Sequence, residues 1–297
     1  MEKKDELVRR LAANGEVIAI ACSTRGVAET ARQLHDSSPI ATAALGRLMS
    51  GCLMMSDLLR NKTDALTLMI EGNGPLGKIL ATGDNSGNVK GYCSNSSVYL
   101  PNEANGHLNV AGGIGKGTLT VIKDQGMKDN YNSTIALHSG EIADDLTYYY
   151  AQSEQLPSSV GLGVLVTPEG KALESGGFLL QLMPFPKEEV VRKLEENIAA
   201  FGNVTDHLRL GEGADDILDQ LLKGFDQKET HRAPVRFYCD CNREIGKKIL
   251  QSLGKSELIS MLSEKKPVEM TCGFCGKKYA YSREEVEDIL SKAEDKK

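Results

Sequence analysis

The pattern of apolar and polar positions divides the chain into three stretches of different character. Up to about residue 183, short β-rich runs such as GEVIAIACS and LTLMIEG predict strands. A longer run at residues 40–61 is rich in Ala, Leu and Met and is apolar around most of its circumference, which predicts a buried helix. This first stretch therefore mixes helices with strands.

Turn and boundary residues extend the same picture. Gly72, Asn73, Gly74 and Pro75 separate two apolar runs and predict a hairpin. Residues 139–158 read as a helix, with acids near its start and Pro157 just past its end. The run VGLGVLVTPEGKALESGGFLLQLMP predicts two more strands joined by a turn. We expect an α+β fold with considerable antiparallel sheet for residues 1–183.

The second stretch, residues 184–231, reads as a helical linker. It opens with Pro184 and Pro186. Its apolar positions form two narrow stripes, at Val190, Leu194 and Ile198 and at Ile217, Leu218, Leu221 and Leu222. Six Lys and Arg face eleven Asp and Glu between residues 187 and 231, a net charge of −5. Helices with such thin apolar faces depend on docking against something else, so we expect a metastable linker; an ordinary pair of surface helices is the alternative.

The third stretch, residues 232–297, is a small cysteine-bearing module. Two short helices are expected between its cysteine pairs, and Ser282 with Glu285 fits a capping box that opens a third helix. The expected apolar positions are Ile245, Ile249, Leu253, Leu258, Ile259, Leu262, Val286, Ile289 and Leu290. The chain thus divides into residues 1–183, 184–231 and 232–297.

Composition limits the function classes. The hydrophobic fraction of 40% and charged fraction of 26% are ordinary for a globular protein. A net charge of −6 argues against a general nucleic-acid binder. No stretch approaches the roughly 18 apolar residues of a membrane span, and the early VIAIAC run is too short for a signal sequence. We therefore expect a cytoplasmic protein with reduced thiols and neither membrane nor nucleic-acid partners.

Four of the seven cysteines form two tight pairs, Cys239 with Cys241 and Cys272 with Cys275, separated by thirty residues. Two such pairs fit the tetrahedral thiolate shell that Zn²⁺ prefers, so we expect one zinc ion per chain on these four residues. His231 is close in sequence, but four cysteines already complete the shell, so we interpret it as a linker histidine. A purely structural zinc, stapling a module with a thin core, is the simpler alternative.

The spacing of the first pair suggests redox chemistry. Residues i and i+2 of extended chain have Cα atoms ~6.6 Å apart, at the outer edge of the ~4.4–6.8 Å range of disulfides. A bond between Cys239 and Cys241 would be strained, and strained local disulfides are the labile kind. A bond between Cys272 and Cys275 across a turn is easier.

Exchanging zinc for two such disulfides would weaken the module. Structural zinc contributes roughly 10–16 kcal/mol to the folding of small metal modules. Disulfides that close loops of three and four residues contribute about 1.6 and 1.9 kcal/mol. Oxidation should therefore melt the module and loosen whatever docks upon it.

The remaining candidate motifs carry no predicted chemistry. Cys22, Cys52 and Cys93 stand singly among apolar or small residues and read as plain core or surface thiols. The run GGIGKGT fails as a phosphate loop, because Lys116 precedes Gly117 rather than Ser or Thr, so we interpret it as a glycine-rich turn. With no Ser–His–Asp set or paired catalytic carboxylates, the sequence predicts neither ATP use nor an enzyme.

The cysteine pattern and two further motifs resemble a known family. CDC at residues 239–241 and CGFC at residues 272–275 resemble the C-terminal switch of the redox-regulated heat-shock chaperones of about thirty-three kilodaltons. GNGPLGKILA and YYYAQSEQLPSS resemble the N-terminal domain of that family. The resemblance covers nearly the whole chain.

This resemblance implies a holdase that binds unfolding proteins without ATP. It implies that the reduced form holds zinc through four thiolates and is inactive. It also implies that oxidation forms the Cys239–Cys241 and Cys272–Cys275 disulfides, releases zinc, unfolds the linker and favours a homodimer.

Two other classes stay open on the residues alone. A zinc-ribbon nucleic-acid binder could use the slightly basic module, whose fourteen Lys and Arg exceed its eleven Asp and Glu. A thiol oxidoreductase could use Cys272 and Cys275 as a catalytic pair, although no βαβ pattern surrounds them.

Overall fold

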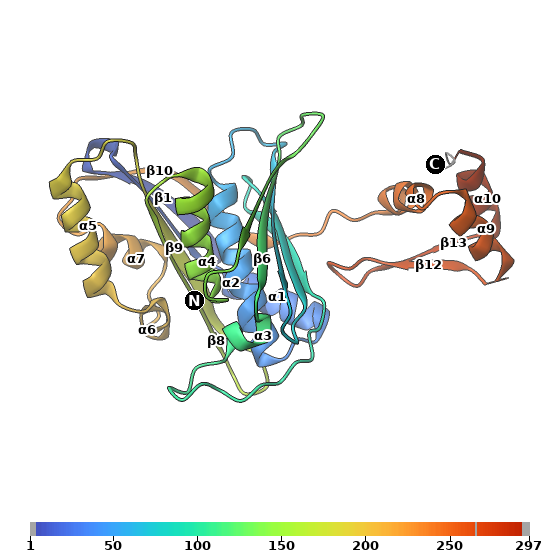
Figure 1. Cartoon of the computed structure of the whole chain (residues 1–297), viewed down its shortest axis with the longest axis horizontal. Coiled ribbons are helices and arrows are strands. Elements are labelled where there is room, and N and C mark those ends of the chain that lie inside the picture. Colours follow the sequence, from blue (N-terminus) through green and yellow to red (C-terminus); the bar gives the residue numbers. More distant parts are fainter. Residues whose placement is uncertain (1–3, 265, 293–297) are drawn as a thin grey trace. The chain divides into compact units, whose positions relative to one another are not determined.

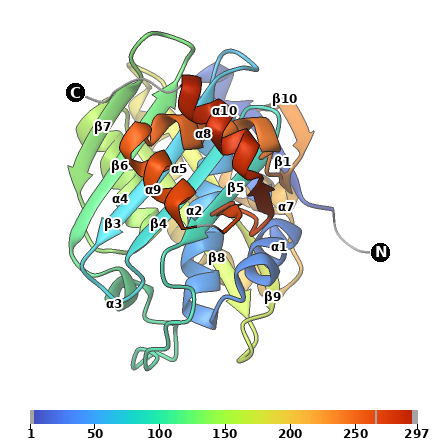
Figure 2. The same ribbon diagram turned by 90° about the vertical axis from the view of Figure 1, so that its right-hand side faces the viewer.

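The computed structural model describes residues 4–264 and 266–292. The chain forms two compact units, the first ending at Tyr238 and the second beginning at Cys239. The first unit holds two sheets (Figures 1 and 2). Each unit has its own apolar core. The α+β class with antiparallel sheet is confirmed.

One sheet of the first unit has five strands in the order β10-β1-β2-β9-β8, all paired antiparallel. Its strands are β1 (Glu6–Ala12), β2 (Val17–Ser23), β8 (Ser158–Val166), β9 (Ala172–Leu182) and β10 (Gln227–Pro234). The β8–β9 hairpin matches the two strands predicted there. Strand β10 is an edge strand of this sheet and pairs with β1.

The other sheet has six strands in the order β11-β5-β4-β3-β6-β7. They are β3 (Ala65–Gly72), β4 (Lys78–Asp84), β5 (Asn88–Cys93), β6 (Gly117–Asp124), β7 (Tyr131–Ala136) and β11 (Arg236–Phe237). Strands β3 and β4 pair antiparallel across Gly72–Pro75, which confirms the predicted hairpin. The short β11 pairs parallel with β5.

Helix α2 (Pro39–Ser56) fills the space between the two sheets, as Figure 1 shows. Sixteen of its residues are buried, because side chains on opposite faces pack against different sheets. Ser38 caps the helix by accepting a hydrogen bond from the Ala41 amide at 3.4 Å. The predicted buried helix is thus confirmed, although it ends at Ser56 rather than at residue 61.

Shorter helices complete this layer. They are α1 (Arg25–His35), α3 (Val110–Ile114) and α4 (Ile142–Tyr149), with one π-helical turn (Tyr150–Glu154) following α4. The helix predicted before Pro157 is confirmed. The glycine-rich run that we interpreted as a turn instead contributes the end of α3, followed by β6.

The linker helices α5 (Glu188–Phe201), α6 (Val204–Arg209) and α7 (Ala214–Leu221) cover the outer face of the five-stranded sheet (Figure 1). Both predicted stripes face this sheet: Val190 and Leu194 are buried, Ile198 is partly buried, and Ile217 and Leu218 have no exposed surface. The helices and the sheet enclose a second apolar cluster. Its buried members are Val8, Ala12, Ala13, Val17, Ala19, Ala21, Phe178, Leu180, Val190, Leu194, Phe201, Val204, Leu208, Ala214, Ile217, Leu218, Leu221 and Leu222.

The boundary predicted between residues 231 and 232 differs from the structure. Strands β10 and β11 belong to the first unit, so residues 232–238 lie with the sheets rather than with the cysteine module. Strand β10 was not predicted, because its residues are mostly polar and exposed and show no alternating apolar pattern. The boundary at residue 183 stays a prediction.

The second unit contains three helices and a hairpin among its described residues. They are α8 (Arg243–Ser252), α9 (Lys255–Ser263), β12 (Val268–Thr271), β13 (Lys278–Tyr281) and α10 (Arg283–Lys292). The buried core consists of Leu250, Leu258, Tyr279, Tyr281, Val286 and Ile289. The capping box is confirmed, since the Ser282 amide donates to Glu285 Oε2 at 2.9 Å and the Glu285 amide to Ser282 Oγ at 3.3 Å.

The predicted apolar stripe of α8 is wrong in part. Ile245 and Ile249 are exposed, as is Ile259 on α9, whereas Gly246 and Leu250 face the core. The Tyr281 hydroxyl reaches over Gly246 to donate to the Arg243 carbonyl at 3.0 Å. Tyr281 of β13 thus packs against the face of α8 that carries Gly246. In the described part of the chain, no helix is long and apolar enough to cross a membrane.

Candidate metal centre

An irregular segment before α8 and a tight turn between β12 and β13 position the four cysteines of the second unit. Cys239 and Cys241 stand just before α8, where Asn242 caps the helix by accepting from the Ile245 amide at 2.9 Å. Cys272 and Cys275 lie in the turn between β12 and β13. The Gly276 amide donates to the Cys272 carbonyl and the Cys272 amide to the Lys277 carbonyl, both at 2.9 Å. This reciprocal pair closes the turn and points both thiols to one side.

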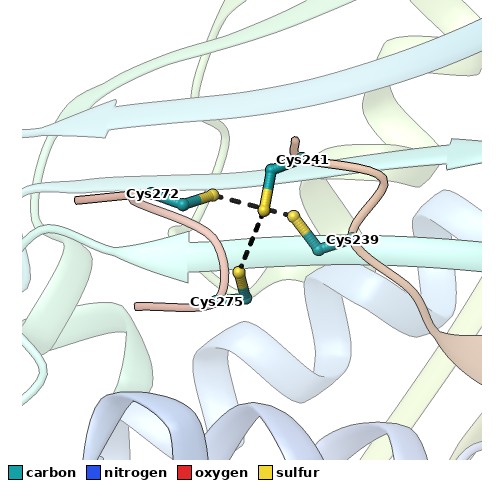
Figure 3. Close-up of side chains that lie close together, drawn as sticks. All are labelled: Cys239, Cys241, Cys272 and Cys275. Atoms are coloured by element: carbon teal, nitrogen blue, oxygen red, sulfur yellow. Dashed lines mark hydrogen bonds between the residues drawn. The ribbon is translucent and has the colours of Figure 1, made fainter. Parts of the chain in front are cut away.

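The four sulfur atoms converge on one point (Figure 3). All four Sγ atoms lie within 4.8 Å of one another, with Cys239 and Cys272 3.7 Å apart and Cys241 and Cys275 3.3 Å apart. A tetrahedral zinc site with Zn–S bonds of ~2.3 Å has sulfurs about 3.8 Å apart along each edge. The donor set and its spacing therefore fit a soft four-coordinate metal ion. All four thiols are free of disulfides in this structure.

Neighbouring groups favour ionisation of one thiol. The Tyr279 hydroxyl lies 3.2 Å from Cys241 Sγ and 2.8 Å from the Cys241 carbonyl oxygen, and its hydrogen can be donated to either. Burial opposes ionisation of Cys241, but hydrogen bonds from Tyr279 and the adjacent thiols outweigh it and lower the Cys241 pKa to about 7. Burial raises the pKa of Cys239 and Cys275. A metal ion that binds here must therefore displace protons from neighbouring thiols.

The other sequence candidates belong to the first unit. His231 belongs to β10, where its Nδ1 atom is 2.5 Å from Asp57 Oδ1, so it is no part of the thiol cluster. Cys22, Cys52 and Cys93 are buried in the first unit, and burial raises the pKa of Cys22 and Cys52 to about 12. They are unreactive core thiols, as predicted. Sequence reasoning missed Tyr279, whose only signal is its position four residues beyond Cys275.

Comparison with known proteins gives one consistent result. A family model described as "Hsp33 protein" matches residues 5–282. Proteins named "33 kDa chaperonin" are similar along their full lengths: that of Clostridioides difficile is 45% identical over 97% of this chain and 99% of its own. The protein of that name from Caldanaerobacter subterraneus is 42% identical over 98% of this chain and 99% of its own length. The crystal structure of the Thermotoga maritima 33 kDa chaperonin, titled a heat shock protein 33 homolog, superposes with a TM-score of 0.87 at 34% identity, covering 97% of this chain and 98% of that one.

Proposed function

Because the chain belongs to the Hsp33 family of molecular chaperones, we propose that it is a redox-regulated holdase that binds unfolding proteins without ATP. Membership of this family makes the chain a chaperone and not an enzyme, so the thiol oxidoreductase alternative is wrong. The convergence of four free thiols at the spacing of a zinc tetrahedron carries the regulatory part of the proposal.

In the reduced state, Cys239, Cys241, Cys272 and Cys275 hold one zinc ion as thiolates, and the chaperone is inactive. The core of the second unit supports this role of zinc, because only six of the described residues form its buried apolar cluster. A core of this size rarely stabilises a module without a metal or disulfides. Zinc would then be the main source of folding free energy for this unit.

In the oxidised state, the Cys239–Cys241 and Cys272–Cys275 disulfides replace the zinc ion. Two such small loops restore only a fraction of the free energy that zinc supplies. The second unit loses its fold, and with it the linker, residues 184–231, detaches from the five-stranded sheet of the first unit. In a reducing compartment such as the cytoplasm, this change would occur only under oxidative stress.

Release of the linker would provide the surface for clients. The sheet face under α5, α6 and α7 carries Val8, Val17, Phe178 and Leu180, all buried in the docked form. Exposed apolar patches of this kind are rare on soluble monomers and favour association. The same surface would therefore bind unfolding proteins and promote a homodimer of the oxidised form.

Disulfide connectivity is the first testable consequence. Oxidation with peroxide should yield Cys239–Cys241 and Cys272–Cys275, because each pair stays close in sequence once zinc no longer holds the pairs together. Peptide mapping after alkylation of free thiols measures this. Mainly cross-pair bonds, such as Cys239–Cys272, would contradict local pairing. The test is a real one, because the Cys239 and Cys272 sulfurs are only 3.7 Å apart in the reduced structure.

The order in which segments unfold is the second testable consequence of the proposal. Under peroxide and mild heat, amides of residues 187–231 should exchange with solvent before those of β3, β4 and α2. The linker helices are held by narrow apolar stripes, whereas α2 is buried between two sheets. Hydrogen exchange followed by mass spectrometry checks the order. Equal protection of the linker in reduced and oxidised protein would rule out its release.

A further inference from the structure

Strand β10, which pairs with β1 at the edge of the five-stranded sheet, has an unusually polar and exposed sequence. It pairs with β1 along seven residues, yet its sequence QKETHRAP is mostly exposed and brings no large apolar side chain to the core. Its pairing is also interrupted, because the register shifts between Arg9 and Arg10. Such a strand is held mainly by backbone hydrogen bonds and charged groups, which any extended chain could replace in part.

Hydrogen bonds at the two ends of the β1–β10 pairing show which residues of β1 direct their backbone groups towards β10. The Ala13 amide donates to the Asp226 carbonyl at 3.3 Å, and the Val235 amide donates to the Asp5 carbonyl at 3.1 Å. Because antiparallel strands alternate the direction of their backbone groups, Leu7, Arg9 and Leu11 also direct their N–H and C=O groups towards β10. The even-numbered residues of β1 direct theirs to β2.

Ion pairs couple β10 to the linker helix α7. Asp215 of α7 binds Arg10 of β1 at 2.5 Å and Arg232 of β10 at 2.8 Å. Asp219 of α7 adds a second contact to Arg10, also at 2.5 Å. Loss of α7 therefore removes Asp215, the counterion that the two strands share, and also removes Asp219 from Arg10. Beyond β10, Val235 is buried in the main core, so this end of the strand stays anchored while the end at Gln227 is free to separate.

We propose that departure of the linker, whose residues 227–231 already belong to β10, also strips the rest of β10 from β1, and that the uncovered edge of β1 binds extended segments of unfolded client chains by strand addition. This inference rests on the proposed holdase function and specifies how a client is held. An exposed strand edge presents a row of unpaired backbone donors and acceptors. Added strands use these groups whatever their sequence, which suits a chaperone with varied clients.

The side chains beside this edge define the preferred segment. Val8 and Ala12 face the cluster that the linker helices cover, so one face of an added strand would lie against the apolar sheet surface. A segment with alternating apolar residues fits this arrangement. Arg10 loses Asp215, Asp219 and Gln227 when the linker leaves. An acidic side chain opposite Arg10, the position that Glu229 holds in β10, would replace them.

Residue-resolved hydrogen exchange tests the proposal directly. The probe is reduced, carboxymethylated α-lactalbumin, a permanently unfolded protein, added to the oxidised and warmed chaperone. The amides of Arg9 and Leu11 should be protected in the reduced form, exchange after activation, and become at least about tenfold slower again with probe bound. The amide of Arg10, directed to β2, should stay protected throughout and serves as the internal control.

Proline substitutions give a matched functional test. Leu11→Pro removes one amide directed outward from β1, a change that edge strands tolerate, and should weaken binding of the probe about tenfold. Lys228→Pro removes the opposing amide of β10 and should leave probe affinity unchanged. Leu11→Ala loses the same side chain but keeps the amide, so it should bind like the wild type.

Three outcomes would overturn strand addition. One is a bound probe with Arg9 and Leu11 still exchanging freely, and another is equal weakening by Leu11→Ala and Leu11→Pro. The third is protection that returns without probe and grows with chaperone concentration, which would assign the edge to a second copy of the chain. Aggregation suppression measured on the same samples distinguishes failure of strand addition from failure of the holdase function. Suppression without protection of the β1 amides rejects strand addition alone. Absence of suppression rejects the holdase function itself.

Discussion

Replacing Leu218 and Leu221 with serine is expected to activate the chaperone under reducing conditions, with zinc still bound. Both side chains are fully buried between α7 and the five-stranded sheet. Burial of a leucine side chain stabilises by roughly 1.5–3 kcal/mol, so the pair should cost the docked linker about 3–6 kcal/mol. A helix of eight residues has little stability of its own to offset that loss.

The measurement is suppression of light scattering by a heat-unfolded test protein, with zinc content determined in parallel. Leu210→Ser is the matched control, because it makes the same chemical change in the same linker at a residue that is 77% exposed. This control should stay inactive until oxidised. If the double variant stays inactive although hydrogen exchange shows its linker released, release alone is not the switch and the disulfides have a further role.

Replacing Cys272 and Cys275 with serine is expected to abolish zinc binding and unfold residues 239–292. The two substitutions remove half of the thiol cluster, and structural zinc supplies roughly 10–16 kcal/mol to modules of this kind. The core of six buried side chains cannot replace that free energy. On the proposed coupling, the linker should also loosen, so this variant should suppress aggregation without any oxidant.

Metal analysis and hydrogen exchange of the second unit check this result. Cys93→Ser, at a thiol of the first unit, is the control and should keep one zinc ion per chain. A full zinc load in the double cysteine variant would reject the assignment of the ligands. Zinc loss with a protected linker would instead reject the coupling between the metal centre and the linker.

The features that the sequence predicted are those encoded locally. Helix α2 is apolar around most of its circumference over eighteen residues, and the hairpin at Gly72–Pro75 has its turn residues between two apolar runs. The linker stripes repeat at helical spacing and lie against the sheet as expected. The paired spacing of the cysteines was enough to predict that four thiols meet.

The features that were missed depend on distant partners. Strand β10 has no alternating pattern, and it is a strand because β1, more than two hundred residues earlier in the chain, offers it an edge, with Arg9 opposite His231. Helix α8 turns Gly246 rather than Ile245 and Ile249 towards the core, where Tyr281 of the distant strand β13 packs against it. Neither relation leaves a local signal.

The central claim is that a single change, oxidation of the four thiols, both releases zinc and activates the chaperone. The most direct test measures zinc content and aggregation suppression on a single sample, before and after peroxide with mild heat, without nucleotide. We expect one zinc ion per chain and no suppression before oxidation, then release of zinc together with strong suppression, both reversed by reductant and zinc. Full suppression while zinc is retained, or complete zinc release without any suppression, would contradict this account.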